Sequence, residues 1–207
     1  MIHTDRLVLR PAVDTDRDAI AALNADPRVG AWLGGARDRA ASDVFVDRVQ
    51  AHEAEHGFGF WVVERKADAR VIGMTGVWWV PPEMDMPGTV EIGWRFMPDA
   101  WGQGYATEAA RAALDYGLRA LGLEEIIAFT ARTNLASQAV MKRIGMVHAP
   151  ERDFEHPGLA DGDPLRPHVV FVATRRYPLR PSGPPPPEGE DLARPDAPPP
   201  GELSRSD

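Results

Sequence analysis

The alternation of apolar and polar residues predicts a series of strands in the first 177 residues of this 207-residue chain. A period of two in hydrophobicity is typical of a strand that buries one face. In the first such run, Leu7 and Leu9 lie on one side while Arg6, Val8 and Arg10 lie on the other. The runs with this pattern are residues 2–10, 58–64, 70–80, 89–96, 126–131 and 168–176, with a shorter run after residue 146.

Between these runs, apolar residues recur at the three- and four-residue spacing of helices that bury one face. Ile20 and Leu23 mark the inner face of the first helix, and Ser42 is predicted to cap the next long one. Gly122 and Gly145 are each expected to end a helix, because glycine readily adopts the left-handed closing conformation. The predicted helices cover residues 14–24, 42–56, 105–121 and 134–144, with a short turn starting at residues 26–27.

The most informative stretch is EIGWRFMPDAWGQGYATEAA, residues 91–110, in which a strand runs through a glycine-containing loop into a helix. Gly102 and Gly104 bracket Gln103, and the helix is predicted to begin at Tyr105. The first turn of a helix has backbone N–H groups without intrahelical partners, and the dipole adds about half a positive charge there. Because glycine has no Cβ, the backbone can approach a phosphate closely. The stretch therefore predicts a phosphate-binding site.

Two common phosphate motifs do not fit this loop. The nucleotide-triphosphate loop GxxxxGK[ST] needs a lysine and a hydroxyl residue that this register lacks, and the dinucleotide fingerprint GxGxxG needs a third glycine. The sequence continues instead with Ala106 and Thr107. Its spacing fits a loop of the form (Gln/Arg)-x-x-Gly-x-(Gly/Ala), with Trp101 in the first position. An ordinary strand–helix turn is the alternative interpretation of this loop on its own.

A second segment, TARTNLASQAVMKRIGM at residues 130–146, follows downstream, where Asn134 can cap a helix that Gly145 ends. Asn134, Ser137 and the run KRIGM at 142–146 resemble the last coenzyme-contacting helix of the GNAT acetyltransferases. The loop WGQGYA at 101–106 resembles the coenzyme A pyrophosphate site of the same family. The likeness covers about residues 1–177, and WGQGYATEA together with the N-terminal run TDRLVLRP is similar to the RimJ/RimL branch.

This resemblance implies an α/β fold in which helices flank a mixed, mostly antiparallel twisted sheet with a splayed central strand pair. Acetyl-CoA would bind as a co-substrate, with its pantetheine along the opened strand edge. Backbone N–H groups near Trp94–Phe96 would face the thioester oxygen, where donors stabilise developing charge. The residues expected to bind acetyl-CoA are Trp94, Arg95, Phe96, Gln103, Gly104, Tyr105, Ala106, Thr107, Asn134 and Ser137.

Acetyl transfer to an amine needs a neutral amine, whereas a free primary amine has a pKa of about 8–10. Glu91 is the candidate general base, directly or through a water, because it lies on the strand beside the predicted phosphate site. A solvated or Arg-paired strand residue is the alternative. Many family members carry a Tyr seven residues after the Asn; here Met141 stands there and cannot donate a proton. Ser137 is the candidate to contact the sulfur, unless it points to solvent.

Composition and charge argue against several classes of protein function and location. The net charge is −8 and no basic stripe is present, which argues against direct nucleic-acid binding. The chain has no Cys, and its six His residues lack ligand spacing, so no metal site is expected. Charges interrupt the N-terminal apolar run, and no run approaches the roughly 20 apolar residues of a membrane span. We therefore expect a cytoplasmic protein without a membrane partner.

Two parts are expected, a GNAT domain over residues 1–177 and a tail over residues 178–207. Ten of the last 30 residues are Pro, and large apolar residues are nearly absent there. Such a segment cannot bury enough surface to offset its ordering entropy, which predicts disorder with polyproline II character. A docking peptide for a partner is the alternative. The protein is expected to be a monomer or a homodimer.

The RimJ/RimL likeness implies the α-amine of a protein N-terminus as the acceptor. A small amine, such as a polyamine or an aminoglycoside, is the alternative, and the acidic net charge is compatible with it. The rival classes are a module that binds acyl-CoA without catalysis, which Met141 favours, and a nucleotide-binding protein of another fold. Residues 81–88 and 152–167 are predicted to shape the acceptor pocket.

Overall fold

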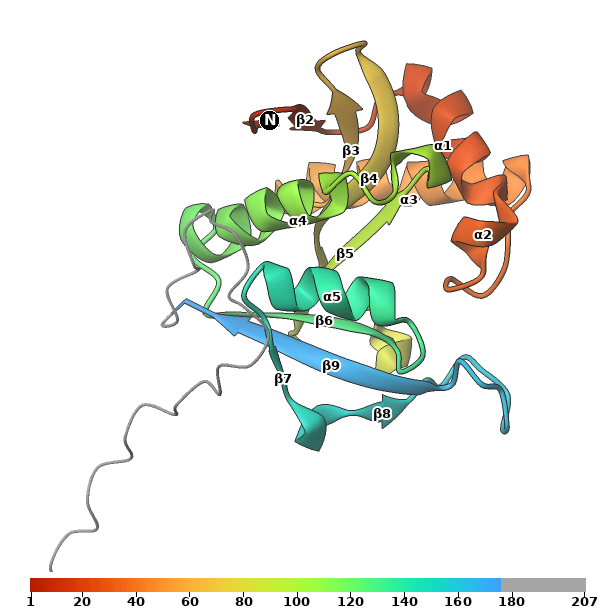
Figure 1. Cartoon of the computed structure of the whole chain (residues 1–207), viewed down its shortest axis with the longest axis vertical. Coiled ribbons are helices and arrows are strands. Elements are labelled where there is room, and N and C mark those ends of the chain that lie inside the picture. The colour runs from red at the N-terminus through yellow and green to blue at the C-terminus, as the bar shows by residue number, and fades with distance from the viewer. Residues whose placement is uncertain (176–207) are drawn as a thin grey trace, which may run out of the picture.

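The computed structural model describes residues 1–175, so the expected tail from Pro178 and the boundary at residue 177 lie outside the described residues. The described part forms one nine-stranded sheet with helices on both faces (Figure 1). Its strands follow the spatial order β1-β2-β3-β4-β5-β6-β9-β7, and β8 pairs with β9. They are β1 (Ile2–His3), β2 (Leu7–Arg10), β3 (Phe60–Arg65), β4 (Arg70–Trp79), β5 (Val90–Phe96), β6 (Glu125–Ala131), β7 (Val147–His148), β8 (Phe154–Glu155) and β9 (Pro167–Thr174).

The helices pack on opposite faces of the sheet and bury a separate apolar core on each. In Figure 1, α4 crosses in front of the strands and α3 lies behind them. Among residues 1–175, no helix combines the length and the apolarity that crossing a membrane requires. The helices are α1 (Arg17–Ala25), α2 (Pro27–Gly30), α3 (Arg39–His56), α4 (Tyr105–Asp115) and α5 (Leu135–Arg143).

Strand β5 presents its alternate residues to these two cores. Ile92 and Phe96 belong to the core beneath α4, together with the helix residues Ala109 and Leu114. Arg95 lies opposite Met74 of β4, which packs in the other core with Ile20 and Val46. Because side chains alternate across a strand, Glu91, Gly93 and Arg95 face the side that carries α1 and α3.

The sheet is antiparallel except between β5 and β6, which run parallel. These two strands are bridged at one position in the described residues, Glu91 opposite Ile127, and separate beyond it. The mixed, mostly antiparallel sheet and the splayed central pair that the sequence led us to expect are thereby confirmed. We call the opening beyond this bridge the split.

The N-terminal run predicted as one strand is two short strands that form a hairpin. Strands β1 and β2 pair antiparallel, with Ile2 opposite Leu9. The prediction of one strand over residues 2–10 was wrong because Thr4 closes a turn. Its backbone N–H donates to the Leu7 carbonyl at 3.0 Å, and its hydroxyl accepts from the Leu7 N–H at 3.0 Å. The predicted burial of Leu7 and Leu9 and the edge position are confirmed.

The cap predicted for the long helix α3 was also wrong. Asp38 caps it, accepting from the Ala41 N–H at 2.8 Å, so the helix begins at Arg39. Ser42 lies fully buried in the first turn and accepts from the Asn24 Nδ2 at 2.9 Å. A hydroxyl residue at a helix start is a good cap in the sequence, but here its tertiary partner on α1 takes that oxygen.

Helix α4 ends earlier than predicted, and the chain continues through a π-helical turn over Tyr116–Ala120. Gly117 lies in this turn, and a Cβ there would come 2.5 Å from the Ile126 Cδ1. The missing side chain lets the turn lie directly on β6. Gly122 then closes the segment at φ 72°, as expected.

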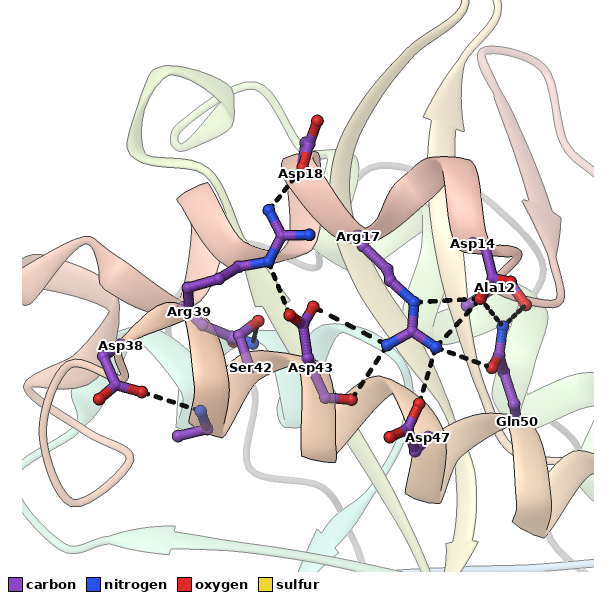
Figure 2. Close-up of polar contacts among 12 residues, drawn as sticks. Ala12, Asp14, Arg17, Asp18, Asp38, Arg39, Ser42, Asp43, Asp47 and Gln50 are labelled. Atoms are coloured by element: carbon purple, nitrogen blue, oxygen red, sulfur yellow. Dashed lines mark hydrogen bonds and ion pairs between the residues drawn. The ribbon is translucent and has the colours of Figure 1, made fainter.

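Ion pairs between α1 and α3 hold these two helices together on their face of the sheet (Figure 2). Arg17 reaches Asp47 at 2.7 Å, and Arg39 reaches Asp18 at 2.6 Å and Asp43 at 2.8 Å. Exposed ion pairs each contribute about 0–1 kcal/mol to the free energy of unfolding, so their main effect here is to fix the relative orientation of the two helices. Helix α3 in turn carries side chains that line the functional cleft.

Replacing Gly76 by Ala should strongly destabilise the fold. A Cβ on Gly76 would overlap the backbone carbonyl of Gly59, which cannot move without disturbing β3. We expect a loss of about 2–3 kcal/mol in the free energy of unfolding, measured by urea denaturation. Gly59→Ala is the matched control, because its Cβ would meet side-chain atoms rather than backbone, with the Glu53 Oε2 at 3.2 Å and the His52 Nδ1 at 3.5 Å. Equal effects of the two substitutions would contradict this account.

Candidate active site

A cleft of about 1660 Å³ opens where β5 and β6 separate. On one face of the sheet its walls come from the first turn of α4 and from α5. On the other face they come from the segment between α2 and α3, from α3 and from residues 156–168. The cleft therefore passes through the sheet at the split. We call the part on the α1–α3 face the acceptor half.

The loop of residues 101–107, which we call the phosphate loop, has the backbone that the sequence predicts. Gly102 and Gly104 adopt φ values of 73° and 80°, which glycine reaches without the clash of a Cβ. Helix α4 starts at Tyr105, and the Gly104 carbonyl accepts from the Glu108 N–H at 3.0 Å. The N–H groups of the first turn precede any intrahelical acceptor and point out of the helix start, as an anion site requires.

Side chains from both sides hold the phosphate loop in place. The Trp101 Nε1 donates to the Phe96 carbonyl at 2.8 Å, and the Arg6 Nη1 donates to the Gln103 carbonyl at 2.9 Å. The Gln103 side chain turns back to donate to the Asp99 carbonyl at 2.7 Å. The loop is thus fixed before any ligand arrives, which lowers the entropic cost of binding.

Glu108, in the first turns of α4, faces the N-terminal hairpin. It accepts from the Thr4 hydroxyl at 2.6 Å and pairs with Arg6 at 2.7 Å. Burial acts to raise the pKa of Glu108, but these hydrogen bonds outweigh it and hold the pKa below its usual value. The carboxylate is therefore neutralised within the protein and does not repel an anion on the loop.

Along β5, the backbone N–H and C=O groups of alternate residues point toward the split. Met97 N–H donates to Ile72 on β4, and the Gly93 carbonyl accepts from Thr75 on β4. The backbone N–H and C=O groups of the odd-numbered residues of β5 therefore point to β4, and those of the even-numbered residues point to β6 and the split. The Trp94 N–H accordingly points into the split, while the backbone of Arg95 points to β4.

The start of α5 supplies the other wall of the split. Asn134 caps the helix, as predicted, with its Oδ1 accepting from the Ser137 N–H at 3.2 Å and its Nδ2 donating to Thr130 at 3.0 Å. Ser137 is half-buried and lines the cleft. Met141 also lines it but is 2% exposed, so the position of the family Tyr is filled by a packed apolar side chain.

Glu91 lies beside the bridge where β5 and β6 meet, with its side chain in the acceptor half. Burial raises the pKa of Glu91 to about 7, against the opposing effect of the Arg95 charge. A carboxyl group with such a pKa can hold or release a proton near neutral pH, as a general base must.

Arg95 extends into the acceptor half and is held there by α1. Its Nη1 donates to the Asn24 Oδ1 at 2.9 Å, and its guanidinium lies 4.4 Å from the Phe45 ring centroid. Burial, together with the like charge of Arg37, lowers the pKa of Arg95 to about 10. The Arg95 side chain thus lines the acceptor half. The sequence analysis had predicted a role only for the backbone of this residue, beside the coenzyme.

Aromatic rings form the floor of the acceptor half. The Phe60 ring lies over Gly93, where a Cβ would come 2.9 Å from its Cζ, and Trp78 stacks at 3.8 Å on His52. On the opposite arm of the split, His156 and His168 line the cleft with ring centroids 4.9 Å apart. Within residues 1–175, no group of three or more acidic or histidine side chains is arranged around a common point for a metal ion.

All of the predicted site residues except Gln103 line this one cleft. Their individual roles remain predictions. The sequence analysis did not point to Asn24, Arg37, Phe45, Arg48 or the two histidines. None of these belongs to a motif. Folding brings Asn24 against Arg95 and the other five residues to the wall of the cleft, so no local signal could have assigned them to the site.

Comparisons with known proteins agree with this geometry. Residues 6–147 match the family model described as an acetyltransferase (GNAT) domain. The FsC-acetyl coenzyme A-N(2)-transacetylase of Aspergillus fumigatus is 32% identical over 194 residues, covering 86% of this chain and 78% of that protein. The structure of a GNAT-family acetyltransferase from Bacillus anthracis superposes with a TM-score of 0.70 at 25% identity, covering 85% of this chain and 99% of that one.

A spermidine N-acetyltransferase from Vibrio cholerae, solved with CoA and spermine, shares the fold at a TM-score of 0.67. Its 18% identity covers 83% of this chain and 97% of that one. The chain belongs to the GNAT family and is an acetyl-CoA-dependent N-acetyltransferase.

Proposed function

We propose that the enzyme moves the acetyl group of acetyl-CoA to a primary amine that enters from the acceptor half, with the α-amine of a peptide or protein N-terminus as the first candidate. The observation that carries this proposal is the passage through the sheet at the split. It connects the phosphate loop on one face with Glu91 on the other.

In this proposal the first-turn N–H groups of α4, at Tyr105, Ala106 and Thr107, hold the pyrophosphate. Asn134 and Ser137 contact the pantetheine arm, and the Trp94 N–H donates to the thioester oxygen as negative charge develops. Donors already aimed at such charge are worth about 3–4 kcal/mol each in a site that excludes water.

Glu91 then takes a proton from the incoming ammonium group, directly or through a water. The neutral nitrogen attacks the thioester carbon, a C–N bond forms, and the C–S bond breaks to leave the coenzyme thiolate. The second proton that the nitrogen loses as it becomes an amide passes to this thiolate, so the products are the amide and the free coenzyme thiol. Ser137 is the proposed hydrogen-bond donor to that sulfur, because Met141 cannot supply a proton.

A small-molecule amine is the second candidate acceptor. The relative from Aspergillus fumigatus, whose name describes transfer to an N(2) position of FsC, favours it. Thiol release from acetyl-CoA, measured across N-terminal peptides and small amines, separates the two candidates. Binding of acetyl-CoA without turnover of any amine would instead support a non-catalytic module.

Gly104→Ala should weaken acetyl-CoA binding by about tenfold or more. The Ala Cβ would strain a residue at φ 80° at the point where the loop backbone must lie close to the pyrophosphate. Isothermal titration calorimetry with acetyl-CoA measures the change. Gly122→Ala is the matched control, because it carries similar strain at φ 72° at the opposite end of the segment. A similar loss of affinity in both variants would refute the assigned phosphate loop.

Glu91→Gln should remove an ionisation with a pKa of about 7 from the pH dependence of kcat and lower kcat by about 100-fold. In the wild type, kcat should rise through pH 7 as the carboxyl group loses its proton. Stopped assays at saturating substrates between pH 5.5 and about 9.5 give the profile. Glu83→Gln removes another carboxylate of the same cleft, and in this variant kcat should still rise through pH 7.

The same substitution should change stability in a defined direction. The folded pKa of Glu91 lies above the unfolded value of 4.5, so the folded state binds more protons between these values. Stability is therefore lost as the pH rises from 4.5 to about 7. Above pH 7, Glu91→Gln should raise the free energy of unfolding by on the order of 1–3 kcal/mol. A destabilised variant at pH 8 would contradict a strained, buried carboxyl group.

A further inference from the structure

The acceptor half contains a cluster of three guanidinium groups. Arg37 precedes α3, Arg48 lies on α3 and Arg95 lies on β5, and all three line the cleft. Within residues 1–175 none of them forms an ion pair with an acidic side chain. The acidic residues of α3 beside them are engaged elsewhere, since Asp43 and Asp47 pair with Arg39 and Arg17.

The cluster is held in shape by neutral contacts. Arg95 and Arg37 both lie against the Phe45 ring, at 4.4 and 5.5 Å from its centroid. Asn24, which is 3% exposed, accepts from the Arg95 Nη1 through its side chain and from the Arg37 N–H through its backbone carbonyl. Its Nδ2 is fixed in turn by Ser42. The guanidinium groups of Arg37 and Arg95 are thus positioned by the protein before a ligand binds.

Holding these charges together has an electrostatic cost. Burial and the charge of Arg48 lower the pKa of Arg37, and Arg37 has the same effect on Arg95. The acids in this half are Glu83 and Glu91. Glu91 attracts Arg95 electrostatically, but its carboxyl group does not come within ion-pair distance of the Arg95 guanidinium. An anion that enters the cleft would relieve the repulsion that remains among the three guanidinium groups, so the cluster points to an anionic ligand.

We propose that Arg37, Arg48 and Arg95 form a carboxylate-binding subsite, and that the acceptor is a primary amine that also carries a carboxylate. This inference rests on the acetyl transfer proposed above and specifies its acceptor. A guanidinium fork binds a carboxylate through two parallel N–H···O bonds, which would orient the acceptor as well as attract it. The amine would lie near Glu91 and the Trp94 N–H, with the carboxylate farther along β5 toward Arg95.

The subsite disfavours a polycation, because the three guanidinium groups would repel it within a partly buried cleft. Two sources of the carboxylate remain, an acidic side chain near the N-terminus of a peptide and a free amino acid. Both present the same chemistry to the cluster, and the experiment treats them as separate arms.

The first measurement is thiol release with acceptors matched in pairs. The peptide pair is Ala-Glu-amide and Ala-Gln-amide, and the small pair is 4-aminobutanoate and 4-aminobutanamide. In at least one pair, the carboxylate member should show a kcat/KM about tenfold or more above that of its neutral partner. Equal values in both pairs, or a preference for spermidine over all four, would overturn the subsite.

The second measurement uses single substitutions of the cluster. Arg37→Gln and Arg48→Gln should each lower kcat/KM for the carboxylate member about tenfold while leaving the neutral member and the KM for acetyl-CoA unchanged. Arg152→Gln is the control, because it removes the same charge from a side chain that pairs with Glu125 away from the cleft. Equal losses for both members of a pair would show a general effect on the fold and contradict the subsite.

A binding measurement keeps the two proposals distinguishable. Calorimetric titration of N-acetyl-4-aminobutanoate and N-acetyl-4-aminobutanamide into the CoA-loaded protein needs no turnover. Tighter binding of the carboxylate product, lost in Arg37→Gln, supports the subsite even if no acceptor is acetylated, in which case only the proposed transfer fails. Equal binding of both products, with turnover of neutral amines intact, would leave the transfer standing and refute the subsite.

Discussion

The single bridge between β5 and β6 is the constraint on which the rest of the site depends. Glu91 opposite Ile127 holds the strands together at one point, and beyond it the parallel pair separates. A sheet edge with unpaired backbone groups inside a protein is costly unless a ligand or a side chain satisfies them. Here Trp101 satisfies the Phe96 carbonyl, and the Trp94 N–H remains directed into the opening. The gap in the sheet is thus the passage between the two faces, and in the proposed reaction it is also the edge that binds the thioester.

The alternation along β5 assigns the two faces to different tasks. The face with Ile92 and Phe96 packs beneath α4, whose start provides the donors for a phosphate. The face with Glu91 and Arg95 meets the segments around α1 and α3, where charged side chains surround an aromatic floor. In the proposed reaction this strand separates the coenzyme from the acceptor, and the reacting groups meet through the split.

The acceptor half is built by long-range contacts rather than by a motif. Asn24 of α1 joins the segment before α3 to β5, and the ion pairs of Arg17 and Arg39 fix α3 against α1. This half also holds Glu91 and Arg95, two groups whose pKa values burial shifts toward the neutral form. Perturbed groups gathered in a cleft are characteristic of functional sites, because their energetic cost is offset by what they bind or catalyse.

The sequence by itself determined the elements and the half of the site that depends on local chemistry. Alternation located the strands, and Gly102, Gly104 and Asn134 fixed the loop and the helix starts, because glycine conformation and capping act within a few residues. Only the tertiary structure decided that Thr4 breaks the first strand, that Asp38 rather than Ser42 caps α3, and that Arg37 approaches Arg95. Each outcome involves a partner distant in the chain, Glu108 for Thr4, Asn24 for Ser42 and Arg95 for Arg37, and no local pattern encodes which distant group a side chain will meet.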